Sequence, residues 1–344
     1  MIQLNNKFAI GCLIQWYEIE LIPQYLESVK QSLNHIENKK NVIIDLYFNT
    51  SQALEKIDKN QIKLSDIKSK YKKILKDIFD YDEDDVSIVG SEYDIRLNQN
   101  KHDEEIYTIA DYRRDFNDKY CEKVDVLMWG ESDSLIPRQT FQILDSLHTS
   151  VKEQTPKYVL FFGTCKMWDE SWKPIEHTDF TDKPFIDGDT KNWWSLRYSM
   201  NQEEMDKVNS KVEELDVRTV NPYKFNGCGL VISSDVVKSG VNIPRSVFFI
   251  HEDTAFLNLL QNMFKNTIPQ YVIKNILLVH NRKHPDKRMY IKGESGIEGQ
   301  DVGAKRLTHS WYDKANKLCE HNAYNLFNQS QTYTWEDVFE DENR

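Results

Sequence analysis

The sequence predicts an α/β fold in which a mostly parallel central sheet is flanked by helices. Short apolar runs at 8–16 and 41–49 have the length of buried strands. Between them, from Leu21 to Ile36, apolar residues recur at helical spacing, and Pro23 lies in the expected first turn. Strands that alternate with helices in this way are typical of parallel sheets whose crossover helices cover both faces.

The same alternation continues along the chain. Further helices are predicted within 51–79 and at 109–121, 137–147, 252–263 and from 310 onward. Further strands are predicted at 86–89, 124–129, 158–162, 229–233 and 272–280. The polar segment 92–105 is predicted to be a loop, and 164–220, where tryptophans alternate with polar residues, is predicted to leave the sheet.

Domain organisation follows from these elements. The sequence shows no internal repeat and no linker rich in proline or serine, which favours one compact domain with insertions. We expect residues 1–290 to form this domain, with the insertion at about 164–220. Residues 291–344 are expected to form a flexible glycine-containing loop and a C-terminal helical extension.

Composition limits the possible functions. The chain has 344 residues, of which 40% are hydrophobic, which is enough for a real core. Its 44 basic and 55 acidic residues give a net charge of −11, so a general electrostatic affinity for nucleic acid or anionic lipid is not expected. The five scattered cysteines have no CxxC spacing, and no apolar run has the length of a membrane span. We expect a cytoplasmic protein without a membrane span.

Two acidic residues follow the predicted strand 124–129 directly. Glu131 and Asp133 are two residues apart, so on extended backbone both side chains point to one side, as chelation of a divalent cation requires. His280 ends another predicted strand, and a mixed carboxylate and imidazole set suits Mn²⁺ or Mg²⁺. The alternative interpretations are a solvated loop for the two acids and a structural role for the histidine.

Two later segments also carry candidate residues. Gly227 and Gly229 precede a strand, and they either let backbone approach a ligand closely or form an ordinary turn. Glu252 and Asp253 begin a helix, where they serve either as a held general base or as a helix cap. The basic segment 282–306 either grips a diphosphate or a nucleic-acid backbone, or is a solvated loop.

Taken in order, these segments resemble the inverting glycosyltransferases of family 2, which have the GT-A (Rossmann-like) fold. The opening strand and helix resemble the family's start, 111–117 stands where the family has an arginine-containing segment, and 127–133 is similar to its Asp-x-Asp as Glu-x-Asp. Phe225–Gly229 resembles the acceptor segment, and 252–253 resembles the pair that contains the catalytic base. The resemblance covers about 8–284. It departs from the family at 47–50, which lacks the usual acidic, serine-containing nucleotide loop.

The resemblance implies direct displacement at the anomeric carbon of a nucleotide-diphosphate sugar by an acceptor hydroxyl, with a glycan or glycoconjugate as acceptor. It implies Asp253 as base beside Glu252, and a Mn²⁺ or Mg²⁺ ion on Glu131, Asp133 and His280. The residues expected on the donor side are Gln15, Asn49, Glu92, Arg113, Asn117 and Ser132. Those expected on the acceptor side are Gly227, Trp193, Trp194 and Arg197, although the tryptophans also fit a local core.

Other functions fit the sequence less well. A transferase acting on a modified base in DNA conflicts with the net charge of −11. A nucleotidyltransferase needs a glycine-rich basic loop after the first strand, and 15–18 has none. A carbohydrate-binding protein without turnover on the same scaffold stays open. The donor nucleotide, the sugar, the acceptor and the oligomeric state are not predicted by the sequence.

Overall fold

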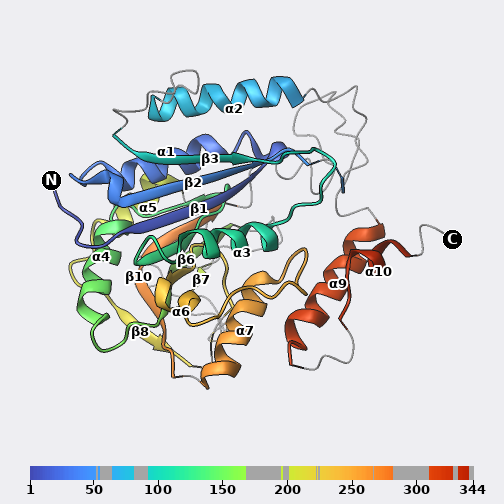
Figure 1. The fold of residues 1–344 in the computed structure, drawn as a ribbon. Coiled ribbons are helices and arrows are strands. Elements are labelled where there is room, and N and C mark those ends of the chain that lie inside the picture. Colours follow the sequence, from blue (N-terminus) through green and yellow to red (C-terminus); the bar gives the residue numbers. More distant parts are fainter. Residues whose placement is uncertain are drawn as a thin grey trace.

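The computed structural model describes residues 1–51, 53–54, 64–80, 92–167, 195–196, 201–221, 223, 225–265, 267–281, 310–327 and 332–340. A 10-stranded sheet in the order β3-β2-β1-β4-β9-β6-β10-β5 runs through these residues, with β7 on β6 and β8 on β10 (Figure 1). The strands are β1 (Phe8–Gln15), β2 (Val42–Asn49), β3 (Asp94–Gln99), β4 (Val126–Trp129), β5 (Ser134–Leu135), β6 (Val159–Met167), β7 (Ser195–Leu196), β8 (Val217–Val220), β9 (Val231–Ser233) and β10 (Gln270–Asn281).

Helices surround this sheet. The α-helices are α1 (Ile22–Leu33), α2 (Leu64–Phe79), α3 (Ile109–Tyr120), α4 (Thr140–Val151), α5 (Gln202–Asn209), α6 (Ser234–Lys238), α7 (Glu252–Phe264), α9 (Ser310–Tyr324) and α10 (Trp335–Phe339). Two 3₁₀ turns are η1 (Trp16–Glu18) and η2 (Lys39–Asn41). Figure 1 shows α1 and α2 on one side of the first three strands and α3 on the other.

Most neighbouring strands in the sheet are parallel. The run β3-β2-β1-β4 is parallel throughout, and β6 is parallel to β10. The short strand β9 is antiparallel to both β4 and β6, and β5 and β8 are antiparallel to β10. The predicted mixed α/β architecture with a mostly parallel sheet is therefore confirmed. One consequence is that β1, β2, β4, β6 and β10 all end at the same edge.

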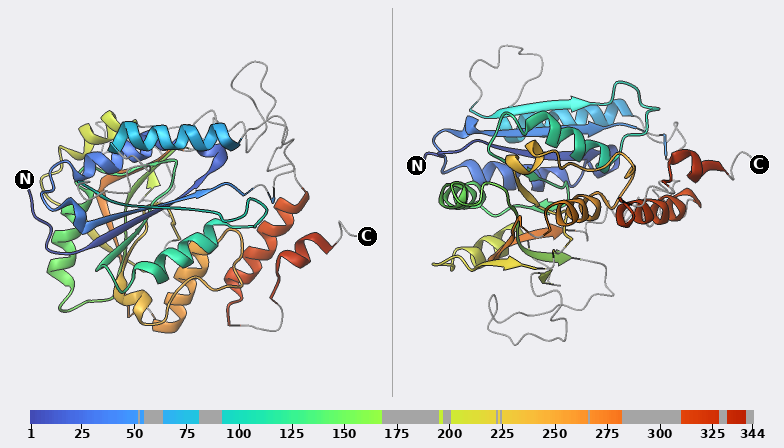
Figure 2. Two further views of the ribbon diagram at one scale, coloured as in Figure 1. Left: turned by 45° about the horizontal axis from the view of Figure 1, so that its top comes forward. Right: turned by 60° about the horizontal axis from the view of Figure 1, so that its bottom comes forward.

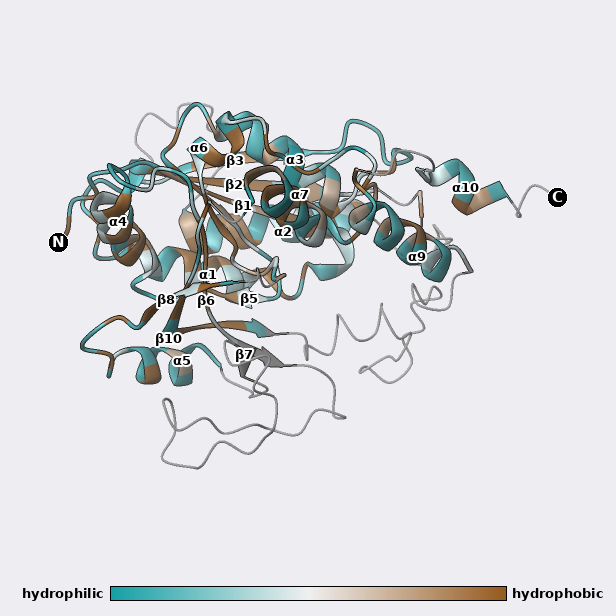
Figure 3. Ribbon diagram, turned by 90° about the horizontal axis from the view of Figure 1, so that it is seen from below, coloured by the Kyte–Doolittle hydropathy of each residue, from teal (hydrophilic) through white to brown (hydrophobic). Residues whose placement is uncertain are grey.

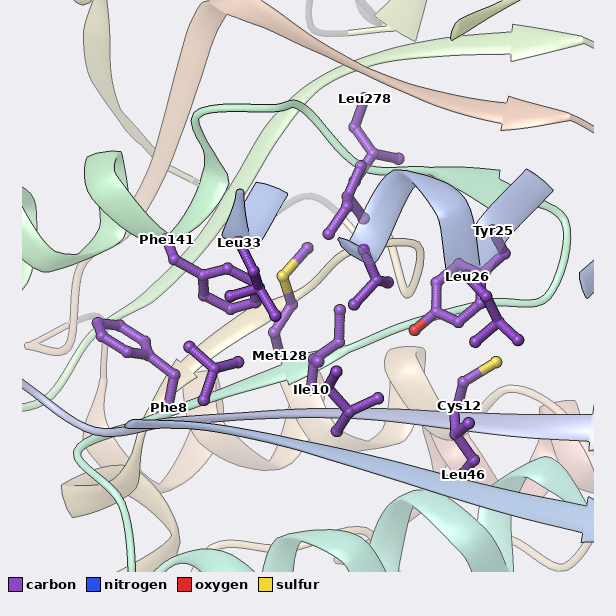
Figure 4. Close-up of a cluster of buried hydrophobic side chains, with 14 of the residues drawn as sticks. Phe8, Ile10, Cys12, Tyr25, Leu26, Leu33, Leu46, Met128, Phe141 and Leu278 are labelled. Atoms are coloured by element: carbon purple, nitrogen blue, oxygen red, sulfur yellow. The ribbon is translucent and has the colours of Figure 1, made fainter. Parts of the chain in front are cut away.

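Strand β1 lies in the core and separates two layers of side chains. Phe8, Ile10 and Cys12 belong to a buried cluster with α1, α2 and α4, whereas Ala9 and Leu13 belong to another with α3, α6 and α7. Figure 4 shows the first cluster, and in Figure 3 the central strands are largely coloured as hydrophobic. The strict alternation of faces along β1 is the period-two pattern of a strand that is buried on both sides.

The structure corrects the predicted third strand. The expected strand at 86–89 lies outside the described residues, and β3 instead forms at Asp94–Gln99, within the segment 92–105 that was predicted to be a loop. Residues 94–99 are half-exposed or exposed, so they show neither an apolar run nor a clean alternation. Pairing with β2 at the edge of the sheet, rather than burial, makes this segment a strand.

The segment 164–220 also differs from the expectation that it leaves the sheet. β6 continues to Met167, and both β7 and β8 return to the sheet. Helix α5 lies between them along the chain and packs against β10. In β8 the first three residues are exposed and only Val220 is buried. Polar strands of this kind carry little periodicity signal.

Helices α9 and α10 pack beside α7 and the loop that precedes it. Helix α9 packs against α7 and α10 (Figure 2). Trp311 of α9 and Trp335 of α10 contact the ring of Phe249, which precedes α7, and Phe248 contacts Trp335. This aromatic cluster fixes the loop that leads into α7. Within the described ranges, no helix has both the length and the apolar character that a bilayer crossing requires.

We predict that Asp45→Ala lowers the free energy of unfolding by about 3 kcal/mol. The buried Asp45 carboxylate on β2 accepts hydrogen bonds from Tyr112 (3.0 Å), Tyr120 (2.5 Å), Asn98 (3.1 Å) and Lys119 (2.8 Å). Its loss leaves two buried tyrosine hydroxyls without this acceptor. Urea unfolding of both proteins measures the difference.

The control is Asp77→Ala, because Asp77 is an exposed residue of α2 whose ion pair with Lys73 lies at the surface. This change is expected to cost less than about 1 kcal/mol. Equal losses in the two variants would contradict a structural role for the Asp45 network.

Candidate active site

The sheet brings the acidic loop and the predicted histidine together. Glu131 and Asp133 follow β4, and the chain then forms β5, which pairs antiparallel with the end of β10. In this register Ser134 lies opposite His280. The two-residue strand β5 therefore anchors the loop after β4 beside the histidine, at the sheet edge where ligands bind in open α/β folds.

His280 contacts both acidic side chains. Its Nε2 atom lies 2.9 Å from Oε2 of Glu131 and 3.3 Å from Oδ2 of Asp133. The side chains of His280 and Asp133 are 4% and 2% exposed, and that of Glu131 is 20% exposed. The structure thus brings together the three side chains that were predicted to hold a metal.

Arg113 joins this group to the start of α7. Its Nη2 donates to Oε1 of Glu131 at 2.7 Å, and its Nη1 donates to the carboxylate of Glu252. Burial alone would lower the pKa of Arg113, but the carboxylates of Glu252 and Glu131 outweigh it and raise this pKa above its ordinary value. Arg113 was predicted to lie on the donor side. Its described contacts make it a buried link between two acidic segments.

Trp129 supports the guanidinium of Arg113. The guanidinium carbon lies 4.7 Å from the centre of the indole ring. The indole Nε1 in turn donates to Oδ1 of Asn117 at 3.0 Å. Asn117, another predicted donor-side residue, is fully buried on α3 and acts through Trp129. Asn117 therefore contacts Trp129, and Trp129 lies between it and Arg113.

The loop before α7 is held from two sides. On one side, Arg114 of α3 donates to the carbonyl groups of Ile243 and Val247 at 2.9 Å. On the other, Oδ1 of Asn316 on α9 lies 3.0 Å from Nε2 of His251. His251 has a left-handed backbone (φ 67°) and caps the helix that begins with Glu252. This conformation, uncommon for a residue with a side chain, sets the direction in which α7 starts.

Gly227 lies against both Arg113 and the predicted base. A Cβ atom at this position would lie 2.6 Å from Nη1 of Arg113 and 3.2 Å from Oδ2 of Asp253. Trp129 and Gly229 hold the segment on β4, because the amide of Gly229 donates to the carbonyl of Trp129 at 3.1 Å. Only a glycine lets the backbone pass so close to these side chains. The half-buried Asp253 is thereby placed beside Gly227 and near Arg113.

Gln15 and Asn49 end the neighbouring strands β1 and β2. The Nδ2 atom of Asn49 donates to Oε1 of Gln15 at 2.9 Å and to the carbonyl of Tyr107 at 2.8 Å. Asn49 is buried and so ties both strands to the segment before α3. The pair lies at the predicted edge of the sheet, where its described contacts are structural.

Ser132 contacts Glu18, a buried acidic residue that was not predicted from the sequence. Its hydroxyl donates to Oε2 of Glu18 at 2.7 Å. Glu18 is buried in the 3₁₀ turn after β1. The sequence signal was an acid just after the first strand, but its contact with Ser132 depends on the pairing of β1 with β4.

Of the remaining predicted residues, Glu92 lies away from this cluster and the others are outside the described residues. Glu92 pairs with Lys39 of η2, and its side chain is 61% exposed. It precedes β3, near the amino ends of the strands, so the structure does not bring it to the cluster. Trp193, Trp194, Arg197 and the basic segment 282–306 lie outside the described residues.

A second missed residue is Cys228. One donor atom from each of Glu131, Cys228 and His280 lies within 4.8 Å of the other two. Burial raises the pKa of the Cys228 thiol, whereas His280 lowers it. The cysteine was visible in the sequence beside Gly227, but nothing in its spacing associated it with His280.

Glu252 is buried at the start of α7. Burial raises its pKa to about 7, with Arg113 opposing this shift and Asp253 adding to it. Arg113 thus pairs with the carboxylates of Glu131 and Glu252, with Asp253 close by, and Asp133 joins the group through its contact with His280. A site of this kind is suited to bind a cation and to move a proton.

Comparison with known proteins gives a similarity of fold alone. The sequence matches no known protein family and no curated protein. Among solved structures, residues 1–349 of S. aureus TarS are similar at 10% identity and a TM-score of 0.45, covering 96% of this chain and 77% of that one. The same protein in complex with UDP-GlcNAc is similar at 10% identity and a TM-score of 0.44, covering 98% and 76%.

We predict that Glu252 makes stability depend on pH. Because its pKa is about 7 in the folded state and 4.5 ordinarily, the native protein binds this proton more tightly than the unfolded chain does. Its contribution is therefore most favourable below about pH 4.5 and falls, by about 3 kcal/mol in all, as the pH rises to about 7. Urea unfolding of wild type and Glu252→Gln from pH 5 to 8 measures this change.

The stability of the wild type relative to the variant is expected to fall as the pH rises, since the variant lacks this titration. The control is Glu203→Gln, an exposed change in the first turn of α5, which is expected to follow the wild-type profile. Parallel curves for wild type and Glu252→Gln would show that the pKa of Glu252 is not raised.

Proposed function

We propose that this chain is a GT-A-type glycosyltransferase that moves a sugar from a nucleotide-diphosphate sugar to an acceptor hydroxyl, with a glycan or glycoconjugate as acceptor. One observation carries the proposal. Three segments that resemble glycosyltransferase motifs, at 131–133, 252–253 and 280, are far apart in the sequence but meet in one cluster. Arg113 contacts Glu131 and Glu252, and His280 contacts Glu131 and Asp133. The similarity in motif order thus has a counterpart in space.

The proposed cation fits the donor atoms that are present. Glu131, Asp133 and His280 offer carboxylate oxygens and an imidazole nitrogen, which suit Mn²⁺ or Mg²⁺. The surplus of carboxylates over guanidinium in the cluster supports a positively charged ligand. When bound, the cation would offset the negative charge of the departing diphosphate.

Asp253 is the proposed general base. Its carboxylate accepts the proton of the acceptor hydroxyl while that oxygen attacks the anomeric carbon and the bond to the diphosphate breaks, which inverts the configuration. Asp253 lies in the first turn of α7, where the helix dipole interacts favourably with a negatively charged side chain. Gly227 lets the backbone of the segment that resembles the acceptor segment lie directly beside Asp253.

Arg113 and Glu252 are proposed to position the other groups. The guanidinium holds the carboxylates of Glu131 and Glu252 in fixed orientations, so the cation ligand and the base keep a constant separation. Gln15, Asn49 and Ser132 are proposed to mark the donor side, because they lie at the ends of β1, β2 and β4. A positioned base contributes about 10²–10⁴-fold to such a reaction.

We expect a nucleotide-sugar donor to stabilise the protein in a metal-dependent way. The test is calorimetry or thermal shift with UDP-, GDP-, CDP- and TDP-sugars, each with and without Mn²⁺. One nucleotide class is expected to raise the melting temperature only when Mn²⁺ is present, because cation and diphosphate bind together. If no donor has an effect, the proposal fails, and direct binding of glycans and of DNA becomes the next measurement.

We expect Asp253→Asn to reduce transfer by about 10²–10⁴-fold without changing donor affinity, since the amide cannot accept the proton. Asp133→Ala is expected to weaken metal-dependent donor binding instead. Turnover with the donor found above and calorimetric donor affinity separate the two effects. The matched control is Asp77→Asn, an exposed change on α2 that should alter neither.

Unchanged turnover in Asp253→Asn would reject the assignment of the base. If the wild-type protein binds donor and glycan but transfers no sugar, it would be a carbohydrate-binding protein on this scaffold.

A further inference from the structure

Cys228 lies close to two of the proposed cation ligands, Glu131 and His280. Its Sγ atom, a carboxylate oxygen of Glu131 and a ring nitrogen of His280 all lie within 4.8 Å of one another. Ligand atoms bound to one tetrahedral cation at about 2.0–2.3 Å are a little under 4 Å apart, so a small adjustment would place all three on one ion. Asp133 adjoins this group through its 3.3 Å contact with His280.

The backbone around Cys228 is held in place. Gly229 has a left-handed conformation (φ 66°), and its amide donates to the carbonyl of Trp129. The amide of Trp129 donates to the carbonyl of Leu230 at 2.9 Å. These bonds fix the cysteine against the end of β4, directly before the loop that carries Glu131. These backbone hydrogen bonds therefore hold Cys228 at a fixed place beside the site.

We propose that Cys228 is a ligand at this site, so that the cation is bound by sulfur as well as by oxygen and nitrogen. A thiolate favours borderline and soft cations, which moves the preference of the site away from Mg²⁺ toward Mn²⁺ and, most strongly, toward Zn²⁺. Binding forms a metal–sulfur bond, and the thiol proton is released to solvent. The inference rests on the cation site proposed above, but it does not depend on sugar transfer.

Cys12 is a buried cysteine that is not part of the proposed cation site. It is fully buried on β1 beside Tyr25 of α1 (Figure 4). It is not among the residues whose donor atoms converge. Cys12→Ser is therefore a matched control, since it removes a buried thiol from the same region and leaves Cys228 in place.

The first test is the absorption spectrum of the protein with Co²⁺, a spectroscopic substitute for Zn²⁺. Wild type and Cys12→Ser are expected to show the near-ultraviolet charge-transfer band of a thiolate–cobalt bond, and Cys228→Ser is expected to lack it. Circular dichroism shows whether each variant is folded. A wild-type protein that binds Co²⁺ without this band, or one that binds no Co²⁺ at all, would overturn the inference, as would a band that persists in folded Cys228→Ser.

The second test compares Zn²⁺ and Mg²⁺ affinities by calorimetry. Cys228→Ser is expected to weaken Zn²⁺ binding by about tenfold or more and to change Mg²⁺ binding by less than about twofold. Equal losses for both cations would contradict a sulfur ligand. The outcomes are separable from the proposed function. A cobalt–thiolate band without donor binding would reject the transferase alone, and metal-dependent donor binding without the band would reject Cys228 alone.

Discussion

The site depends on one buried interaction, the bridge that Arg113 makes between Glu131 and Glu252. A guanidinium with 2% exposure needs paired carboxylates, because an unpaired buried charge costs several kcal/mol. Glu131 comes from the loop after β4, and Glu252 begins α7. Arg113 therefore links two segments that lie about 120 residues apart in the sequence, and it places Asp253, the neighbour of Glu252, relative to Glu131. The ring of Trp129 packs against the guanidinium of Arg113, and Asn117 accepts a hydrogen bond from Trp129.

The close approach of the layers around Arg113 requires residues without side chains. At Gly130 a Cβ atom would lie 2.1 Å from the hydroxyl of Tyr25, and at Gly11 it would lie 2.5 Å from the ring of Phe116. Together with Gly227, these positions let two helices and a loop pack directly against the middle of β1 and the end of β4. Gly11, Gly130 and Gly227 are therefore required by close packing next to the site.

Much of the fold was predictable because buried strands and amphipathic helices carry a periodic signal. The strands 8–15, 42–49 and 126–129 and the helices at 22–33 and 109–120 lie close to where the pattern placed them. The edge strand β3 and the short strand β8 carry no such signal, because their side chains are largely exposed or half-exposed and they owe their form to pairing.

The site was predictable in its residue types and not in its contacts. Acids after a strand and at a helix start pointed to Glu131, Asp133 and Asp253. The contacts of Arg113 with Glu252, of Ser132 with Glu18 and of Cys228 with His280 follow from strand order and from β5, which no local pattern encodes. Glu92 was misplaced for the same reason, since its position depends on where β3 begins.

The contact between α9 and the loop before α7 has a consequence for synthesis of the chain. His251 sets the direction of α7, and its ring is held by Asn316, far toward the C-terminus. The aromatic residues that cover Phe249 come from 311 and 335. During translation, the strands and most of the helices are synthesised before these residues. The acidic pair of α7 thus gains this support only after α9 and α10 have been made, and a nascent protein lacking α9 holds an unfinished site.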